Sequence, residues 1–294
     1  MSHSQVPTPV LLASRVRTDE KRIMAALERR GVAYTYVDSR SVWGFLGRSA
    51  ERPATVVLNR EIGQARAQYA ATLLEQAGHR VINSARAVEV CGDKWRTSVA
   101  LQQAGIPTPR TALALTPDAA LEAFEAVGYP AVVKPLTGSW GRLVTRVPDR
   151  PTAETVMEYV AALPGPAAHI VYVQELVAKP DRDIRVIVIG GEPIGAVYRR
   201  SDQWRTNVAR GGTTEACPLT DEIAELSAAA AEAVGADIAG VDLIEDCEGR
   251  LTVLEVNHGV EFSGFQAVLG EDLHVADRIA DHLTARLQSC SESL

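Results

Sequence analysis

The stretch Ala239-Gly-Val-Asp-Leu-Ile-Glu-Asp-Cys-Glu-Gly-Arg-Leu-Thr-Val-Leu-Glu-Val-Asn257 says most about the fold. Two apolar runs flank a short polar turn, a pattern typical of a β-hairpin. If the turn pairs Asp246 with Leu251, counting back places Asp242 directly opposite Glu255. Directly opposed residues on antiparallel strands point to the same face, with Cβ atoms about 4.5–5.5 Å apart.

This face of the predicted hairpin carries a possible metal site. Asn257 lies two residues beyond Glu255 and therefore shares its face with Glu255 and Asp242. Two carboxylates and an amide oxygen repel one another unless a cation lies between them, and oxygen ligands suit Mg²⁺. A polar, solvent-facing side of an edge hairpin fits the same pattern, so the hairpin alone leaves both interpretations open.

The composition sets the class of protein. The chain has 294 residues, of which 46% are hydrophobic and 23% charged, which is typical of a soluble globular protein with two or three lobes. Its net charge of −7 argues against general binding to nucleic acid or to a membrane surface, because both are polyanionic.

The compartment is expected to be the cytoplasm. No apolar run approaches the roughly 20 residues that span a bilayer, and the polar start lacks the plan of a signal peptide. The four cysteines lie far apart, without the paired spacing of zinc or redox sites, which favours reduced thiols. The cysteines are Cys91, Cys217, Cys247 and Cys290.

Alternating strands and helices predict an α/β fold in three parts. Residues 1–90 read as a small parallel α/β domain, residues 91–171 as a second lobe, and residues 172–294 as a third lobe rich in hairpins. Polar residues that could bind a nucleotide lie in the second and third parts.

Lys134 ends an apolar run and precedes the glycine-bearing loop Thr137-Gly-Ser-Trp-Gly-Arg142. Backbone N–H groups of such a loop can surround an anion, with the lysine as a point charge. The loop is not a Walker motif, and an ordinary turn explains it equally well. Lys94, at the start of the preceding predicted helix, could be a surface residue.

Cationic residues collect in the third part of an otherwise acidic chain. Arg199, Arg200, Arg205 and Arg210 all fall within a short stretch, whereas Arg185, two residues after Asp183, could form a local ion pair with it. Beside a metal site they favour phosphate or carboxylate ligands, although a solvated charged face is the competing interpretation.

The order of these motifs resembles the ATP-grasp superfamily over residues 8–285. It is carried by Asp93-Lys94, Val-Val-Lys134-Pro, the glycine loop, Gln174-Glu175-Leu-Val177, Asp183-Ile-Arg185, Ala-Arg210-Gly-Gly and Asp242…Glu255-Val-Asn257. Within it the chain is most similar to the amino-group carrier protein ligases of the LysX/ArgX type, relatives of the ribosomal-protein glutamate ligases. That resemblance is carried by Cys91-Gly-Asp-Lys-Trp95, Tyr198-Arg-Arg-Ser201, Cys217-Pro-Leu-Thr220 and Glu255-Val-Asn-His258.

The resemblance implies an ATP-grasp fold with an N-terminal Rossmann-like pre-ATP-grasp domain, and ATP and Mg²⁺ as cofactors. It implies ATP contacts at Lys94, Lys134, Gly138, Ser139, Trp140, Gly141, Arg142, Leu143, Gln174, Glu175, Leu176, Val177, Asp183, Arg199 and Asn207. It implies metal ligation by Asp242, Glu255 and Asn257, and catalytic roles for Arg185 and Arg210.

The resemblance also implies the reaction. ATP would convert a carboxylate to an acyl phosphate, which an amine then attacks. The carboxylate would be the side chain of a C-terminal glutamate on a small acidic amino-group carrier protein, and the amine that of a free amino acid. We expect no nucleic-acid or membrane partner, and a homo-oligomer.

The amino acid is predicted from Gly264 and Phe265, because a Gly-Phe pair looks like the glutamate-using type. A ring at Phe265 would shorten the pocket against the extra methylene of 2-aminoadipate, although such discrimination is only about 1–3 kcal/mol, and Phe265 could instead be core packing. Glutamate is therefore favoured. The alternatives are 2-aminoadipate, glutamate ligation to another protein or peptide tail, and a non-catalytic nucleotide-binding regulator. Arginine, lysine or secondary-metabolite synthesis all remain open as pathways.

Overall fold

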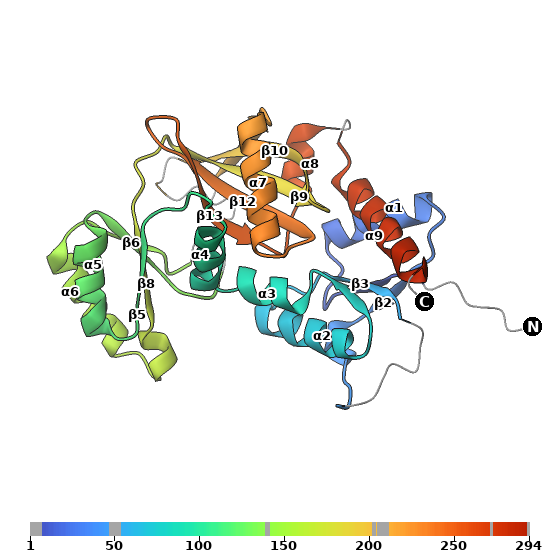
Figure 1. Ribbon diagram of the computed structural model, residues 1–294, viewed down its shortest axis with the longest axis horizontal. Helices are drawn as coiled ribbons and strands as arrows, with labels where there is room; N and C mark the ends of the chain where they lie inside the picture. Colours follow the sequence, from blue (N-terminus) through green and yellow to red (C-terminus); the bar gives the residue numbers. More distant parts are fainter. Residues whose placement is uncertain are drawn as a thin grey trace, which may run out of the picture.

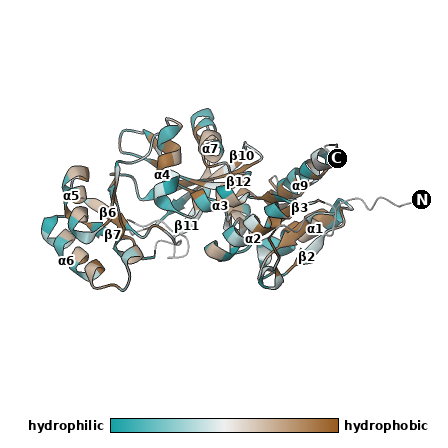
Figure 2. Cartoon of the chain, turned by 60° about the horizontal axis from the view of Figure 1, so that its bottom comes forward, coloured by the Kyte–Doolittle hydropathy of each residue, from teal (hydrophilic) through white to brown (hydrophobic). Residues whose placement is uncertain are grey.

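A computed structural model of the chain describes residues 8–46, 54–138, 142–201, 204, 212–270 and 273–292. Its secondary structure forms three sheets with helices packed on them, and the lobe that carries α5 and α6 stands at one end of the molecule (Figure 1). Hydrophobic residues concentrate in the strands, and the outward helix faces are hydrophilic (Figure 2). No helix among the described residues is both long enough and apolar enough to cross a membrane.

The first sheet is parallel, in the order β2-β1-β3-β4. Its strands are β1 (Val10–Leu12), β2 (Thr35–Val37), β3 (Val56–Asn59) and β4 (Arg80–Ile82), and its helices are α1 (Thr18–Arg29), α2 (Gln64–Gln76) and α3 (Ala85–Cys91), with a 3₁₀ turn η1 (Ser39–Ser41). This confirms the parallel α/β prediction for the first part of the chain. Helix α3 was not predicted, because its seven residues are too few to show a helical period.

The second sheet is antiparallel, in the order β5-β8-β6-β7. It comprises β5 (Thr111–Ala114), β6 (Ala131–Lys134), β7 (Thr145–Val147) and β8 (Val171–Glu175), together with α5 (Pro117–Val127), α6 (Arg150–Ala161) and η2 (Pro166–His169). Helix α4 (Lys94–Gln103) precedes these elements in the chain but packs on the third sheet, where Leu101 joins the buried cluster that contains Val253. Phe124, fully buried, anchors the core between the sheet and helices α5 and α6.

The third sheet is antiparallel and places β9 at its centre, in the order β11-β10-β9-β12-β13. It comprises β9 (Arg182–Ile189), β10 (Glu192–Arg200), β11 (Thr213–Cys217), β12 (Ile238–Glu245) and β13 (Leu251–Asn257), with helices α7 (Asp221–Ala233), α8 (Ser263–Leu269) and α9 (Val275–Glu292). Alternation along β9 sends Ile184 and Val186 into the core and Asp183 and Arg185 to the other face.

The last helix packs on the first. Helix α9 lies beside α1 (Figure 1), and Ile279 and Leu283 share a buried cluster with Ile23 and Leu27. Arg30 donates from Nε to an Asp281 carboxylate oxygen at 2.6 Å. The two ends of the chain therefore form one packing unit, although they were assigned to separate parts of the sequence.

Candidate active site

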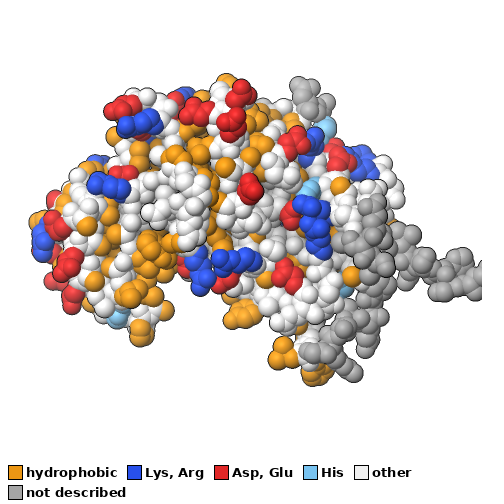
Figure 3. Space-filling view, in the orientation of Figure 1, with side chains coloured by type: hydrophobic (Ala, Val, Ile, Leu, Met, Phe, Trp, Pro, Cys, Tyr) orange, Lys and Arg blue, Asp and Glu red, His pale blue; other side chains and the backbone are white. Residues whose placement is uncertain are grey.

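A cavity of about 550 Å³ is lined by residues of the second and third sheets and by residues that adjoin the strands of the first sheet, such as Arg60 directly after β3. From one side the molecule is visibly notched between the lobe carrying α5 and α6 and the rest, with Lys and Arg side chains gathered beside the notch (Figure 3). Most of the predicted site residues line this cavity: Lys94, Lys134, Gly138, Arg142, Gln174, Glu175, Leu176, Val177, Asp183, Arg185, Arg199, Glu255, Asn257, Gly264 and Phe265.

The two predicted lysines reach the cavity from different elements. Asp93 caps α4 by accepting hydrogen bonds from the backbone N–H groups of Trp95 and Arg96, which fixes Lys94 in the first turn. The Lys94 ammonium then donates to the Gly138 carbonyl at 2.9 Å. Lys94 is thus held against the start of the glycine loop rather than free on the surface.

Lys134 ends β6 and its ammonium donates to Gln174 Oε1 at 2.6 Å. Burial and the charge of Lys94 lower the pKa of Lys134 to about 8, while Glu255 opposes the shift. Among the described residues this half-buried lysine makes one hydrogen bond, so two of its donors can bind an anion that enters the cavity.

The segment after β8 forms one wall of the cavity. Glu175 accepts from the Arg110 backbone N–H at 2.8 Å and from Arg110 Nε at 3.2 Å, and the Leu176 N–H donates to the Pro130 carbonyl. Leu176 and Val177 face the cavity with apolar side chains. A flat apolar wall beside a fixed backbone is suited to an aromatic ring such as adenine.

Asp242 pairs with Glu255 across β12 and β13, as predicted from the sequence. The turn, however, pairs Glu245 rather than Asp246 with Leu251, and a register shift between Asp242 and Leu243 leaves Leu254 unpaired. This bulge restores the predicted pairing. Without it Glu255 would share a face with Val253, which is fully buried in the core.

The carboxylate of Asp242 is held by two arginines below the cavity. Arg185 donates to it from Nε and, at 2.8 Å, from Nη2, and Arg199 Nη2 lies 3.1 Å from Asp242 Oδ1. Burial favours the protonated form, but the two guanidinium groups hold the pKa of Asp242 below its usual value. Arg199 also donates to Asp183 at 2.6 Å. Charged side chains therefore form a continuous row across β10, β9, β12 and β13.

The residues present fit a magnesium ion. Glu255 lines the cavity and its carboxylate makes no hydrogen bond or ion pair within the described part of the chain. The Asn257 amide donates from Nδ2 to Asp242 Oδ2 at 3.4 Å, which leaves its Oδ1 as a ligand. The donor set is oxygen only, which suits a hard cation, and residues 8–292, as far as they are described, hold no cluster of three or more His, Cys, Asp or Glu that would suggest another metal.

Several predicted residues lie elsewhere. Leu143 does not line the cavity: it is 81% exposed, and its φ of 58° places it in the left-handed region. Asp242 does not line the cavity either: it is buried, and Arg185 and Arg199 bind its carboxylate. Five further predicted residues fall outside the described residues: Ser139, Trp140, Gly141, Asn207 and Arg210.

Gly264 and Phe265 lie in the first turn of α8, and both line the cavity. Phe265 is only 4% exposed and belongs to the core cluster shared with α1 and α9. Phe265 therefore forms part of the cavity wall and also packs in the core.

Sequence reasoning missed the contribution of the first sheet. Arg17, Arg60 and Gln64 line the cavity, as do Lys179 and His258. A signal for Arg60 was present, because Arg60 directly follows β3 and ligands of open α/β sheets bind beyond the carboxyl ends of the strands. Gln64 Oε1 accepts from His258 Nε2 at 2.7 Å and so joins α2 to the end of β13.

Comparison with known proteins gives consistent matches along the chain. The LysX preATP-grasp domain family matches residues 10–90, and the RimK-like ATP-grasp domain family matches residues 91–283. The glutamate–LysW ligase ArgX of Sulfolobus acidocaldarius is 33% identical over 93% of this chain and 96% of its own length. The α-aminoadipate–LysW ligase LysX of the same organism is 32% identical over 84% of this chain and 91% of its own.

Solved structures share the fold. A RimK domain ATP-grasp protein from Sphaerobacter thermophilus superposes with a TM-score of 0.76 at 25% identity, over 94% of this chain and 98% of that one. The ATP-grasp ligase PsnB, in complex with a precursor variant, Mg and ADP, superposes with a TM-score of 0.71 at 22% identity, over 95% and 98% of the two chains.

Proposed function

We propose, from the premise that this chain belongs to the RimK-like ATP-grasp family, that it joins the α-amine of glutamate to a carboxylate on a small carrier protein. The chain is an ATP-dependent carboxylate–amine ligase, and its cofactors are ATP and Mg²⁺. Relatives named as LysW ligases support a small acidic carrier that ends in glutamate as the second substrate.

We assign the ATP end of the cavity to α4, β6 and β8. Lys94 and Lys134 would bind phosphates, and the segment from Gln174 to Val177 would hold adenine by backbone contacts and its apolar side chains. The loop over the phosphates would comprise Gly138, Ser139, Trp140, Gly141, Arg142 and Leu143, with Asp183, Arg199 and Asn207 near ribose and phosphates.

We assign the metal to Asp242, Glu255 and Asn257. The bound ion would offset charge on the transferring phosphoryl group. The carrier carboxylate would attack the γ-phosphorus, with ADP leaving, and the amine would then displace phosphate from the acyl carbon. Arg185 and Arg210 would stabilise the oxyanion that develops in the second step, since that charge needs a nearby cation.

Glutamate is favoured over 2-aminoadipate because Phe265 forms part of the cavity wall beside Gly264. A ring fixed in the core cannot move away to admit a longer side chain without a cost in packing. Ligation of glutamate to another protein or peptide tail would use the same residues. The three-part division at residues 90 and 171, a homo-oligomer, and action in the cytoplasm within amino-acid or secondary-metabolite synthesis belong to the same proposal.

The Glu255 carboxylate, which has no partner among the described residues and faces a cavity that also holds two lysines, carries this proposal. The test mixes the protein with ATP, Mg²⁺, one amino acid and a small acidic protein that ends in glutamate, and measures intact mass. We expect a mass increase with glutamate and a smaller yield with 2-aminoadipate. No increase with either amino acid would contradict the carrier reaction, and a larger yield with 2-aminoadipate would contradict the role given to Phe265.

A further inference from the structure

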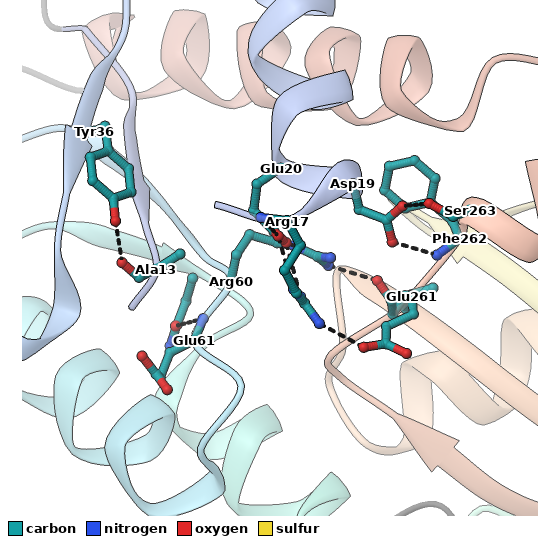
Figure 4. Close-up of polar contacts among 12 residues, drawn as sticks. Ala13, Arg17, Asp19, Glu20, Tyr36, Arg60, Glu61, Glu261, Phe262 and Ser263 are labelled. Atoms are coloured by element: carbon teal, nitrogen blue, oxygen red, sulfur yellow. Dashed lines mark hydrogen bonds and ion pairs between the residues drawn. The ribbon is translucent and has the colours of Figure 1, made fainter. Parts of the chain in front are cut away.

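The wall where the N-terminal sheet meets the segment after β13 contains two arginines that the assignments above leave unused. Arg17 precedes α1, Arg60 follows β3, and both line the cavity. Their guanidinium groups extend toward the segment that carries Glu261 (Figure 4). Each lies about 200 or more positions from that segment in sequence.

Arg60 is buried but incompletely bonded. It is 5% exposed; its Nε donates to Glu20 Oε1 at 2.9 Å and its Nη1 to the Val260 carbonyl at 2.8 Å. Its Nη2 is buried and makes no hydrogen bond to any described residue. Buried donors are almost always paired, so an unpaired guanidinium nitrogen on a cavity wall marks a place for an acceptor.

Arg17 already holds a carboxylate of the kind expected there. Its Nη1 donates to Glu261 Oε1 at 2.6 Å, while Nε and Nη2 each donate to Glu20 at 2.9 Å. The Glu261 side chain is 55% exposed, so a ligand could displace it. Glu20, fully buried, balances one of the two arginine charges and Glu261 the other, so an anion that displaces Glu261 would balance the second charge.

These arginines belong to the N-terminal domain and lie close to the end of β13, which carries the proposed metal ligands Glu255 and Asn257 (the metal face). Arg60 Nη1 donates to the carbonyl of Val260, which lies three residues beyond Asn257, and Arg60 and His258 both line the cavity. His258 directly follows Asn257. The lysines and the apolar wall come instead from α4, β6 and the segment after β8, so the arginines are separate from the ATP end.

We propose that Arg60, together with Arg17, binds one of the two carboxylates of the amino-acid substrate, which displaces Glu261 from Arg17. The inference rests on the proposed function, because it places the amine donor between these arginines and the metal face. Arg60 Nη2 and the Arg17 Nη1 that Glu261 releases would donate to the carboxylate, and a neutral side chain at the same place would leave them unpaired.

The test is calorimetric titration of L-glutamate into the protein bound to Mg²⁺ and a non-hydrolysable ATP analogue. Arg60→Gln should weaken glutamate binding at least about tenfold, because a charge-assisted pair is lost from a desolvated site. Affinity for the ATP analogue should change less than about twofold. Arg66→Gln is the matched control, since Arg66 pairs with Glu61 on the same domain but does not line the cavity.

Arg17→Gln serves as the second variant if Arg60→Gln does not fold, because Arg17 is more exposed, and it should also weaken glutamate binding several-fold. Glutamine and isoglutamine, each lacking one carboxylate, identify which carboxylate is held: the weaker ligand lacks it. Unchanged glutamate affinity in both variants, or equal loss of nucleotide affinity, would overturn the proposal. If Arg60→Gln loses glutamate binding but no carrier gains mass, the carrier reaction fails and the carboxylate site stands.

Discussion

The two ends of the cavity are built in different ways. At the ATP end Lys94, Lys134 and Gln174 come from adjacent elements of the middle of the chain, and a short sequence motif marks each of them. At the opposite end Arg17 and Arg60 meet Val260 and Glu261 from the far end of the sequence. The proposed nucleotide site thus rests on local motifs, and the proposed amine-donor site depends on long-range packing between the N-terminal domain and the segment after β13.

The largest effect is expected where the two ends meet, at Glu255. Glu255→Gln removes a charge that faces the cavity, and we expect ligation to fall about 100–1000-fold, as for loss of a group that stabilises developing charge. Measuring ATP turnover and circular dichroism together tests this, because Glu255 makes no hydrogen bond to described residues and the fold should survive. Glu248→Gln, in the exposed turn of the same hairpin, is the control. Wild-type turnover in Glu255→Gln would contradict the metal assignment.

Glu20→Gln tests whether the amine-donor end depends on long-range packing. Glu20 is fully buried between Arg17 and Arg60, and removing its charge leaves two partly buried cations facing each other. We expect a loss of about 3 kcal/mol in the free energy of unfolding, as for a broken buried ion pair. Urea denaturation measures it. A loss below about 1 kcal/mol would mean that the ion pairs of Glu20 contribute no more to the free energy of unfolding than exposed ion pairs do.

The third prediction concerns His258, which follows β13, and the effect of acid on the free energy of unfolding. Burial lowers the pKa of His258 to about 4, whereas in the unfolded chain it is about 6.5. The unfolded state therefore binds the proton first, and stability contributed by neutral His258 is complete above about pH 6.5 and is lost as the pH falls. We expect about 2 kcal/mol less free energy of unfolding at pH 5 than at pH 7.5 from this residue. His258→Gln should remove that component in urea titrations, and an unchanged pH slope would refute it.

The smallest effect is expected at Phe265, where the cavity wall is also the core. Phe265→Leu replaces the ring with a smaller apolar side chain and so enlarges the cavity. We expect the preference for glutamate over 2-aminoadipate to fall by up to about tenfold, since one methylene contributes about 1–3 kcal/mol. The ratio of kcat/KM values for the two amino acids measures it. An unchanged ratio would leave Phe265 as packing alone.

The sequence named more residues of the proposed ATP end than of the proposed amine-donor end, for a physical reason. Lys134 ends an apolar run that predicts a strand, and Gln174 belongs to a short motif, so both could be named without knowledge of their partners. Arg60 acquires its role only through contacts about 200 positions away, which no local period encodes. The carboxyl end of β3 was the available signal, and it indicates a region of the sheet rather than a partner.

The pairing of Asp242 with Glu255 was correct, but the register assumed for the turn was wrong. The prediction placed Asp246 opposite Leu251, whereas Glu245 takes that position and the bulge at Leu254 compensates by one residue. A bulge inserts a residue without a change in hydrophobic pattern, so it could not be read from the sequence. Roles expected at Ser139, Trp140, Gly141, Asn207 and Arg210 stay predictions, since these residues fall outside the described part of the chain.

The packing of α9 on α1 has a consequence for synthesis on the ribosome. Arg30 and Asp281 are 251 positions apart, which at about 5–20 residues per second corresponds to roughly 10–50 s of translation. Throughout that interval Ile23 and Leu27 have emerged without the helix that buries them. The domain that appears first is thus completed last, and the nascent chain exposes an apolar surface to chaperones until the final helix is released.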